Sequence, residues 1–277
     1  MATGSALIYD FSAMLGSSPI AGALDFQVNF PPSNALRHYP GQSWRSSTSP
    51  TLIYWKCDLG VQVTLDYVLL AGLNLDKGTL AAGYPKVHAT NDGATYTDAT
   101  QTEAEWIASG ESLGSVTHDS LWYGKIRLSA EKTYRYFSVW WSWTAAPVEY
   151  TELGLFRVGK KTQLTYPHVG THSVPYRDRL VSRSTKLYAG HRRRVPVGIK
   201  RETGRDLPLL YKNMAEAEWK LLEKVFKATN TLDPLFIDAY PDNGVESLIY
   251  GTFSDEGLDE AKYDSGLADV SFTIEEM

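Results

Sequence analysis

The pattern of hydrophobic and polar positions divides the chain into a first half of short strands and a second half that holds one helix. In residues 1–160, β-branched and aromatic runs such as Val61–Leu65 and Ser138–Trp141 alternate at short intervals with Gly, Asn, Asp and Pro. This pattern predicts strands joined by turns. The stretch Trp55–Gly60, followed by Asp66–Leu70, predicts a strand, a turn and a second strand.

The helix is predicted over residues 214–228, where apolar side chains recur at helical spacing. Asn213 is a candidate N-cap, and Glu216 three positions later completes a pattern close to a capping box. Glu216 and Lys220 form one favourable i,i+4 pair, and Glu223 and Lys227 form another. The apolar positions are Met214, Ala217, Trp219, Leu221, Leu222, Val225 and Phe226.

Strands surround this helix in residues 161–277. Pro234–Asp238 and Leu248–Phe253 are rich in apolar and β-branched residues, and in Ala268–Glu275 apolar residues alternate with polar ones. That alternation is typical of a strand with one solvated face. We therefore predict a mainly β chain with two domains, a sandwich over residues 1–160 and a sandwich with one packed helix over residues 161–277.

Composition favours a globular protein made in a cytoplasm. The 277 residues are 43% hydrophobic and 21% charged, and Cys57 is the one cysteine, so an intramolecular disulfide is excluded. The first thirty residues lack the features of a signal peptide, and no run is long enough for a membrane span. Seven of the eight tryptophans fall in the first half, and Trp55, Trp106 and Trp140 are predicted core residues.

Charge is distributed unevenly along the chain. The net charge of −5 argues against general nucleic-acid binding, and no specific nucleic acid is predicted as a partner. Residues 161–210 hold 11 basic and three acidic residues, a net +8, whereas residues 211–277 hold five basic and 15 acidic residues, a net −10. Segments of opposite sign can pair across a subunit boundary or cancel within one subunit, and both alternatives stay open. The candidate interface residues are Arg192, Arg193, Arg194, Asp255, Glu256, Asp259 and Glu260.

Five islands of residues in the first half resemble, in their order, the discoidin domain, also called the coagulation factor five/eight type C domain. The islands are Asn34-Ala35-Leu36 with Trp44, then Trp55–Gly60, the predicted hairpin Asn91-Asp92-Gly93, Arg135-Tyr136-Phe137, and Glu152–Phe156. The resemblance covers about residues 30–158. It implies an eight-stranded jelly-roll sandwich that binds sugars, phospholipid surfaces or proteins through loops at one end.

A calcium ion lies in many members of that family beside an Asp that follows the Asn-Ala-Leu segment. Arg37 stands at this position, and an arginine cannot ligate a hard cation, so no cofactor is predicted, although Glu152 could still contribute to a calcium site. A sugar site needs an exposed aromatic ring beside polar groups. The candidate ligand-binding residues in predicted loops are Trp44, Arg45, Asn74, Asp76, Trp122 and Tyr123.

Residues 163–277 resemble the tail-tube-like module of bacteriophage tail tubes, distal tail proteins and minor tail proteins. The resemblance rests on layout: the helix with Trp219, the strand Pro234–Ile237, the strand Tyr250–Phe253 and the acidic end Ile274-Glu275-Glu276. It implies a ring of copies that contacts other tail proteins.

Two functions follow from these resemblances. The first is a structural component of a bacteriophage tail tip, located in the virion, whose sandwich contacts host surface polysaccharide. The alternative is a free-standing carbohydrate-binding protein or an accessory module of a glycan-degrading enzyme. We predict no catalytic activity of the chain itself: Glu103 and Glu105, for example, are expected to be solvated rather than a glycosidase pair.

Overall fold

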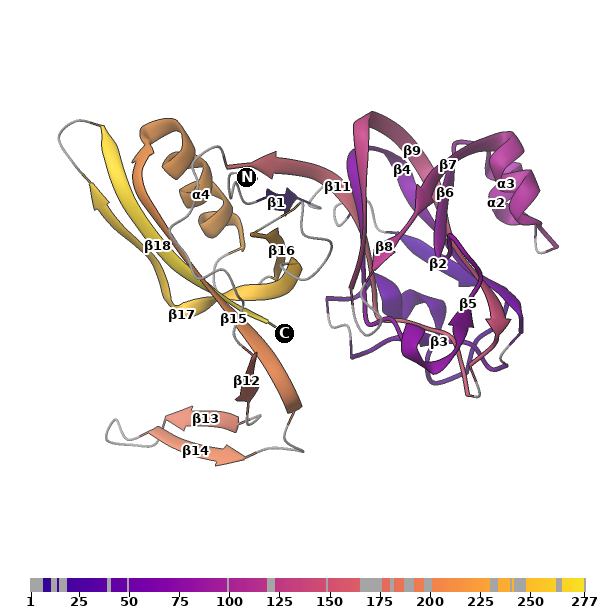
Figure 1. The fold of residues 1–277 in the computed structure, drawn as a ribbon, viewed down its shortest axis with the longest axis horizontal. Helices are drawn as coiled ribbons and strands as arrows, with labels where there is room; N and C mark the ends of the chain where they lie inside the picture. Colours follow the sequence, from indigo (N-terminus) through magenta and orange to yellow (C-terminus); the bar gives the residue numbers. More distant parts are fainter. Residues whose placement is uncertain are drawn as a thin grey trace.

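The computed structural model describes most of the N-terminal half and the strands and helix of the C-terminal half. The described residues are 7–10, 14, 19–38, 41–48, 50–98, 100–118, 123–147, 149–164, 176–179, 182–186, 192–196, 201–229, 234–239, 241, 248–262 and 266–276. Figure 1 shows two bodies side by side, joined where β11 leaves the N-terminal one.

The N-terminal body is a β-sandwich built around two long antiparallel strands, β4 (Leu52–Ala71) and β9 (Tyr123–Ala145). Two short helices, α2 and α3, lie on its far side from the C-terminal body (Figure 1). Its other elements are β2 (Ile20–Ala23), β3 (Trp44–Arg45), β5 (Thr79–Leu80), β6 (Lys86–Thr90), β7 (Gly110–Ser115), β8 (Thr117–His118), β10 (Glu152–Leu153), β11 (Leu155–Gln163), the 3-10 helices η1 (Pro32–Leu36) and η2 (Leu75–Lys77), α2 (Gly93–Thr97) and α3 (Glu103–Ser109).

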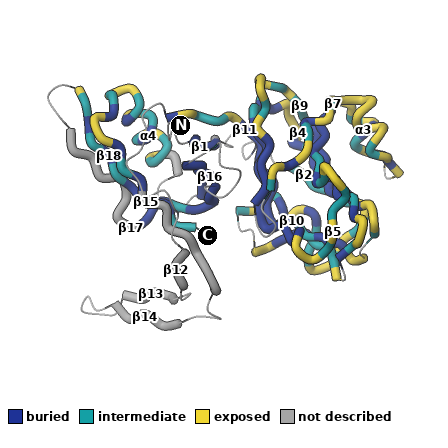
Figure 2. The backbone as a smooth tube through the Cα atoms, viewed as in Figure 1, coloured by how far each residue is buried: buried dark blue, intermediate teal, exposed yellow. Residues whose placement is uncertain are grey.

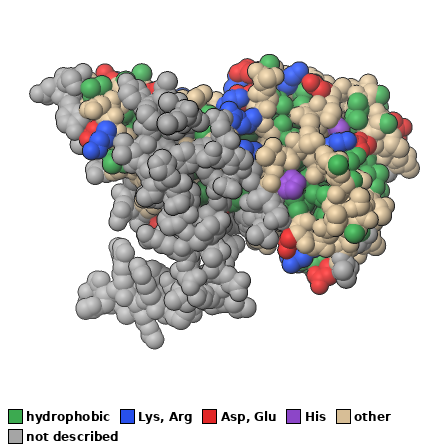
Figure 3. Space-filling view, in the orientation of Figure 1, with side chains coloured by type: hydrophobic (Ala, Val, Ile, Leu, Met, Phe, Trp, Pro, Cys, Tyr) green, Lys and Arg blue, Asp and Glu red, His purple; other side chains and the backbone are tan. Residues whose placement is uncertain are grey.

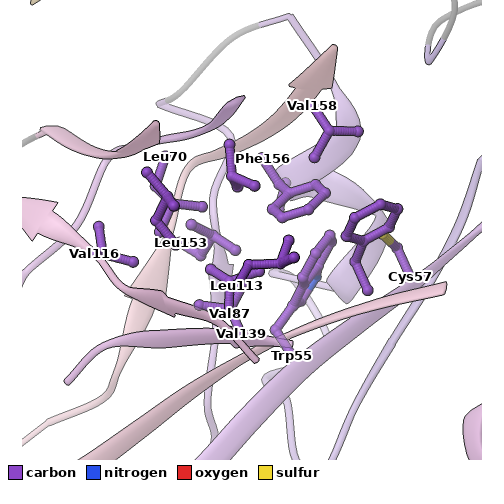
Figure 4. Close-up of a cluster of buried hydrophobic side chains, with 14 of the residues drawn as sticks. Trp55, Cys57, Leu70, Val87, Leu113, Val116, Val139, Leu153, Phe156 and Val158 are labelled. Atoms are coloured by element: carbon purple, nitrogen blue, oxygen red, sulfur yellow. The ribbon is translucent and has the colours of Figure 1, made fainter. Parts of the chain in front are cut away.

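Alternation along the strands gives this body two apolar clusters. Trp55 and Val139 point into the main core, where they pack with Phe156 (Figure 4). Their strand neighbours Tyr54 and Trp140 point to the opposite face and pack in a smaller aromatic cluster. Because side chains on a strand alternate between faces, one aromatic-rich pair of strands supplies both layers. Trp55, Trp106 and Trp140 are buried, which confirms the core prediction.

Two local predictions in this half need correction. The segment after Trp55 continues as one strand instead of turning: Gly60, at φ 77°, lies in a register shift between Asp58 and Val63 that leaves the β4–β9 ladder intact on both sides. A bulge of this kind bends a strand without ending it. Asp92 does not start a hairpin, because its side chain accepts hydrogen bonds from the backbone N–H groups of Ala94 and Thr95 and caps α2.

The C-terminal body is an antiparallel sheet with one helix packed on it (Figure 1). α4 (Glu216–Thr229) buries Trp219 and Leu222 against the sheet. The strands are β12 (Tyr176–Arg179), β15 (Arg201–Ala215), β16 (Leu235–Asp238), β17 (Leu248–Lys262) and β18 (Leu267–Glu276), with β13 (Ser182–Lys186) and β14 (Arg192–Pro196) forming a separate two-stranded sheet. In β18 every second residue from Ala268 to Ile274 is buried, as the alternation predicts.

The helix itself is confirmed, but its predicted start is wrong. Asn213 lies within β15, in a register shift of the β15–β18 ladder, with φ at 53°. Its backbone N–H donates to the Asp269 side chain, so the strand pairing extends to Ala215 and delays the helix. The two predicted ion pairs on α4, Glu216–Lys220 and Glu223–Lys227, are present.

One hydrogen-bonded sheet runs through both bodies. β1 (Leu7–Asp10) pairs with β11 on one side and with β16 on the other, so the N-terminal strand closes the seam between the two predicted domains. A third apolar cluster fills the seam; Tyr67, Tyr123 and Phe236 are among its members. The seam also holds a buried ion pair, in which Lys125 Nζ lies 2.6 Å from Asp238 Oδ2.

The mainly β prediction is therefore confirmed, with a jelly-roll-like sandwich followed by a sheet that carries one packed helix. Among the described residues, no helix combines the length and the apolarity that crossing a bilayer requires. On the face seen in Figure 3, apolar side chains of the sandwich are interspersed with charged and other polar ones.

Candidate binding site at the Arg45 corner

The candidate site lies at one end of the sandwich, where β3 pairs with β10. Arg45 faces Glu152 across this short ladder, and Trp44 faces Leu153. Trp44 and Leu153 are fully buried, so alternation turns Arg45 and Glu152 outward. Ser43 precedes β3, and its hydroxyl donates a hydrogen bond to the Glu152 carboxylate.

The guanidinium of Arg45 lies between two aromatic rings. Its central carbon is 4.1 Å from the ring centroid of Phe30 and 4.5 Å from that of Tyr150. Its Nε donates to Glu152 Oε1 at 3.0 Å. Stacking on two rings and one ion pair fix the orientation of a side chain that is otherwise flexible. We call Phe30, Ser43, Arg45, Tyr150 and Glu152 the Arg45 corner.

Polar groups stay available at this corner. An arginine has five N–H donors, and only Nε of Arg45 is engaged by the described part of the chain, which leaves the four Nη hydrogens. Glu152 uses Oε1 for both of its contacts, and Oε2 has no partner within the same residues. The Arg45 and Glu152 side chains are 26% and 18% exposed, so both can be reached from solvent.

Partly buried hydrogen bonds hold the corner from below. Asn74 donates to the Tyr150 carbonyl at 2.7 Å and accepts from the Glu152 N–H at 2.9 Å. The Trp44 indole donates to the carbonyl of Asp25. Burial raises the pKa of the Asp25 carboxyl, but hydrogen bonds from Ser47 and Thr48 outweigh it and leave that pKa below its ordinary value.

The predicted ligand-binding residues separate into two groups. Arg45 and Asn74 meet at the corner, the first half-buried and the second 8% exposed beneath it. Asp76 lies two residues from Asn74 in η2 and pairs with its neighbour Lys77 at 3.2 Å. Trp44 has no exposed ring face on which a sugar could stack, so the expectation of an exposed platform there is not met.

The remaining two predicted residues do not join the corner. Tyr123 is 1% exposed in the seam, where its hydroxyl donates to Glu276 at 2.7 Å. Trp122 lies outside the described residues. Sequence reasoning missed Phe30 and Tyr150 as aromatic partners, although Tyr150 stands in the same short segment as Glu152.

The residues at the corner do not fit a calcium ion. Arg45, rather than a metal, neutralises the Glu152 carboxylate. Arg37 donates to the Gln42 side chain, and its carbonyl accepts from Arg157 at 2.7 Å. A calcium ion takes six to eight oxygen ligands, whereas here Arg45 engages Glu152 Oε1 and Arg157 engages the Arg37 carbonyl.

The predicted subunit interface falls on stretches of two strands where the side chains are not described. Arg192, Arg193 and Arg194 are on β14, and Asp255, Glu256, Asp259 and Glu260 are on β17. Pairing of these residues between copies stays a prediction.

No family model and no curated protein matches the sequence. Among solved structures, the chain is similar to chitosan-binding module 1 of a chitosanase/glucanase from Paenibacillus sp. IK-5, with 18% identity over 52% of this chain and 96% of that one and a TM-score of 0.37. It is also similar to the family 32 carbohydrate-binding module of Clostridium perfringens NanJ in complex with galactose (11% identity, 57% and 99% covered, TM-score 0.37). A third is a fucolectin from striped bass (Morone saxatilis) serum (12% identity, 65% and 56% covered, TM-score 0.39).

At these identities and TM-scores, the fold assignment rests on the strand pairing described above. None of these three is a tail protein, and the tail-tip function predicted for the chain, with its ring-forming module in residues 161–277, stays a prediction.

Proposed function

We propose that this chain is a non-catalytic binding protein and that the Arg45 corner binds neutral, hydroxyl-rich glycans. The supporting observation is that two available groups lie side by side: the four Nη hydrogens of Arg45, which can donate, and Oε2 of Glu152, which can accept. A sugar hydroxyl both donates and accepts hydrogen bonds, so neighbouring hydroxyls can use the two groups together.

Charge separates this ligand class from anions. An isolated arginine would favour a carboxylate or a phosphate. Glu152 lies within 3.0 Å of the guanidinium and repels an anion that approaches Oε2, while the pair as a whole is neutral. The half-buried rings of Phe30 and Tyr150 add apolar surface beside the polar groups, a combination typical of small-molecule sites.

The test is binding of the purified full chain to an array of neutral and acidic glycans, followed by calorimetry with the best ligand. Arg45→Met removes the donors and keeps an apolar side chain between the rings. Hydrogen bonds to a charged group contribute about 1.5–3 kcal/mol, so we expect the affinity to fall roughly 10- to 100-fold.

Arg135→Met is the matched control. Arg135 also combines an ion pair, to Asp58 at 2.7 Å, with a ring contact, to Tyr136 at 4.9 Å, but it lies elsewhere on the sandwich. Its substitution should leave glycan affinity unchanged. The proposal fails if no neutral glycan binds, or if both substitutions weaken binding equally.

A further inference from the structure

Helix α3 is attached to the sandwich by very few side chains. Within Glu103–Ser109, only Trp106 is buried and only Glu103 is half-buried, while the other five residues are exposed (Figure 2). A capping box between Thr102 and Glu105 stabilises the start of the helix without contacting the sheet. The side chains of α3 that are not exposed are therefore one indole and one carboxylate, and the carbonyl of Ser109 at the end of the helix accepts a hydrogen bond from the Thr90 hydroxyl at 2.9 Å.

The Glu103 carboxylate is bound by three side chains at alternate positions of one segment. Tyr84 donates from its hydroxyl at 2.5 Å, Lys86 Nζ lies at 3.4 Å, and His88 Nε2 lies at 3.0 Å. Lys86 and His88 share one face of β6, and Tyr84 lies two residues before the strand, so this segment presents all three groups to the helix. The expectation that Glu103 is solvated was wrong for this reason.

His88 is the unusual member of this cluster because it is fully buried. Its Nε2 donates to Glu103, and its Nδ1 has no hydrogen-bond partner among the described residues. This arrangement suits a neutral imidazole, in which Nδ1 carries no proton. A second proton would place an N–H at Nδ1 without an acceptor and a charge inside the protein.

The surroundings of His88 offer one compensating charge. This charge is the Glu103 carboxylate on α3. The Lys86 ammonium on β6 also pairs with that carboxylate and repels a positive charge on His88. The opposite residues are Ser138 on β9 and Ser112 on β7, neither of which ionises in this range. Burial lowers the pKa of His88, and this exceeds the raising effect of Glu103.

An aromatic layer lies beneath α3. Trp106 packs there with Tyr54, Tyr136 and Trp140, and the rings of Tyr54 and Trp140 are 4.6 Å apart. All four side chains are less than one-tenth exposed in the closed arrangement. Release of α3 would bring this aromatic surface into contact with solvent.

We propose that α3 is an acid-sensitive strap: when His88 takes up a proton, its buried ring carries a charge and an Nδ1–H without an acceptor, and α3 opens over the aromatic layer so that water reaches the ring. The direction in which pH shifts the equilibrium between closed and open α3 follows from linkage. A histidine whose pKa is lower in the closed state stabilises closure above its ordinary pKa of about 6.5, and this contribution is lost as the pH falls through that value. Glu103, whose pKa is also lowered, acts in the same direction at more acidic pH.

Hydrogen exchange of the full chain, measured by mass spectrometry and corrected for intrinsic rates, tests the strap. Between pH 7.5 and 5.5 the opening constant of residues 103–109 should rise by up to about tenfold, the limit that linkage sets for one proton taken up near pH 6.5 by the open arrangement alone. Exchange in β11 should not change. In His88→Gln, which keeps a donor toward Glu103 but cannot titrate, the rise should disappear.

His118→Gln is the matched control, since His118 lies on β8, outside this cluster, and its substitution should preserve the rise. Glu103→Gln should increase exchange of α3 already at pH 7.5. If His88→Gln fails to fold, an NMR titration of His88 in the unaltered chain decides the question. The proposal is overturned if α3 exchange does not change with pH, if His88→Gln retains the rise, or if His88 titrates at or above 6.5.

Discussion

The buried ion pair between the two bodies is the best point at which to test how they are joined. Lys125 on β9 and Asp238 on β16 are 113 positions apart, and their charged atoms lie 2.6 Å from each other with side-chain exposures of 5% and 0%. Lys125 also donates to the carbonyl of Pro241 at 3.0 Å, and the Tyr9 hydroxyl lies 3.5 Å from Asp238. Neither charge can be solvated by water if its partner is removed.

Each single substitution should therefore be costly. Lys125→Met leaves a buried carboxylate, and Asp238→Asn leaves a buried ammonium group, and the loss of one partner from such a pair costs about 3–5 kcal/mol. The double substitution removes both charges, so it should cost less than the sum of the two. We expect an interaction free energy on the order of 2–3 kcal/mol.

Urea unfolding of the four proteins, followed by circular dichroism, measures this quantity. Lys160 and Glu131 form the matched surface pair at 2.9 Å, with exposures of 52% and 56%. Their double-mutant cycle should give no more than about 1 kcal/mol. If the unfolding free energy lost in the double variant equals the sum of the two single losses to within about 0.5 kcal/mol, the role of this pair in joining the two bodies is refuted.

Three further substitutions or treatments test single features. Cys57 is fully buried and burial raises the pKa of its thiol, so a thiol reagent should label the native chain slowly and label the unfolded chain stoichiometrically. Gly110→Ala should cost about 1–3 kcal/mol in thermal unfolding, because a Cβ there would lie 2.1 Å from the carbonyl oxygen of Ala89; unchanged stability would contradict this close approach. Thr102→Ala should cost about 0.5–2 kcal/mol through loss of the capping box of α3, and Thr102→Ser should restore most of it.

Alternation along the strands was the part of the fold most accessible from sequence. It identified β18 before any partner strand was known, whereas the burial of Trp55 and Trp140 was predicted from their large aromatic side chains. Alternation alone does not decide which of two adjacent residues faces the core when the strand is only two residues long. Trp44 and Arg45 are such neighbours, and the pairing with Glu152 and Leu153 decides that the indole is buried.

Other features depend on contacts that local sequence does not encode. Tyr123 is buried because β9 passes through the seam, where its hydroxyl meets Glu276, 153 positions away. Asn213 has the local features of an N-cap, but the β15–β18 pairing extends past it. In the candidate site, Arg45 and Asn74 could be predicted as polar loop residues, whereas the ring of Phe30 over the guanidinium could not.

The position of β1 has a consequence for the order in which the chain folds. Residues 7–10 are made long before one of their two partner strands, β16, which begins at Leu235. The sandwich around β4 and β9 can assemble during synthesis, while the seam must wait until β16 and β17 have left the ribosome. Closing a loop of more than two hundred residues is slow compared with local pairing. We expect the seam to form last, with β1 exposing an unpaired edge to chaperones or to other nascent chains until then.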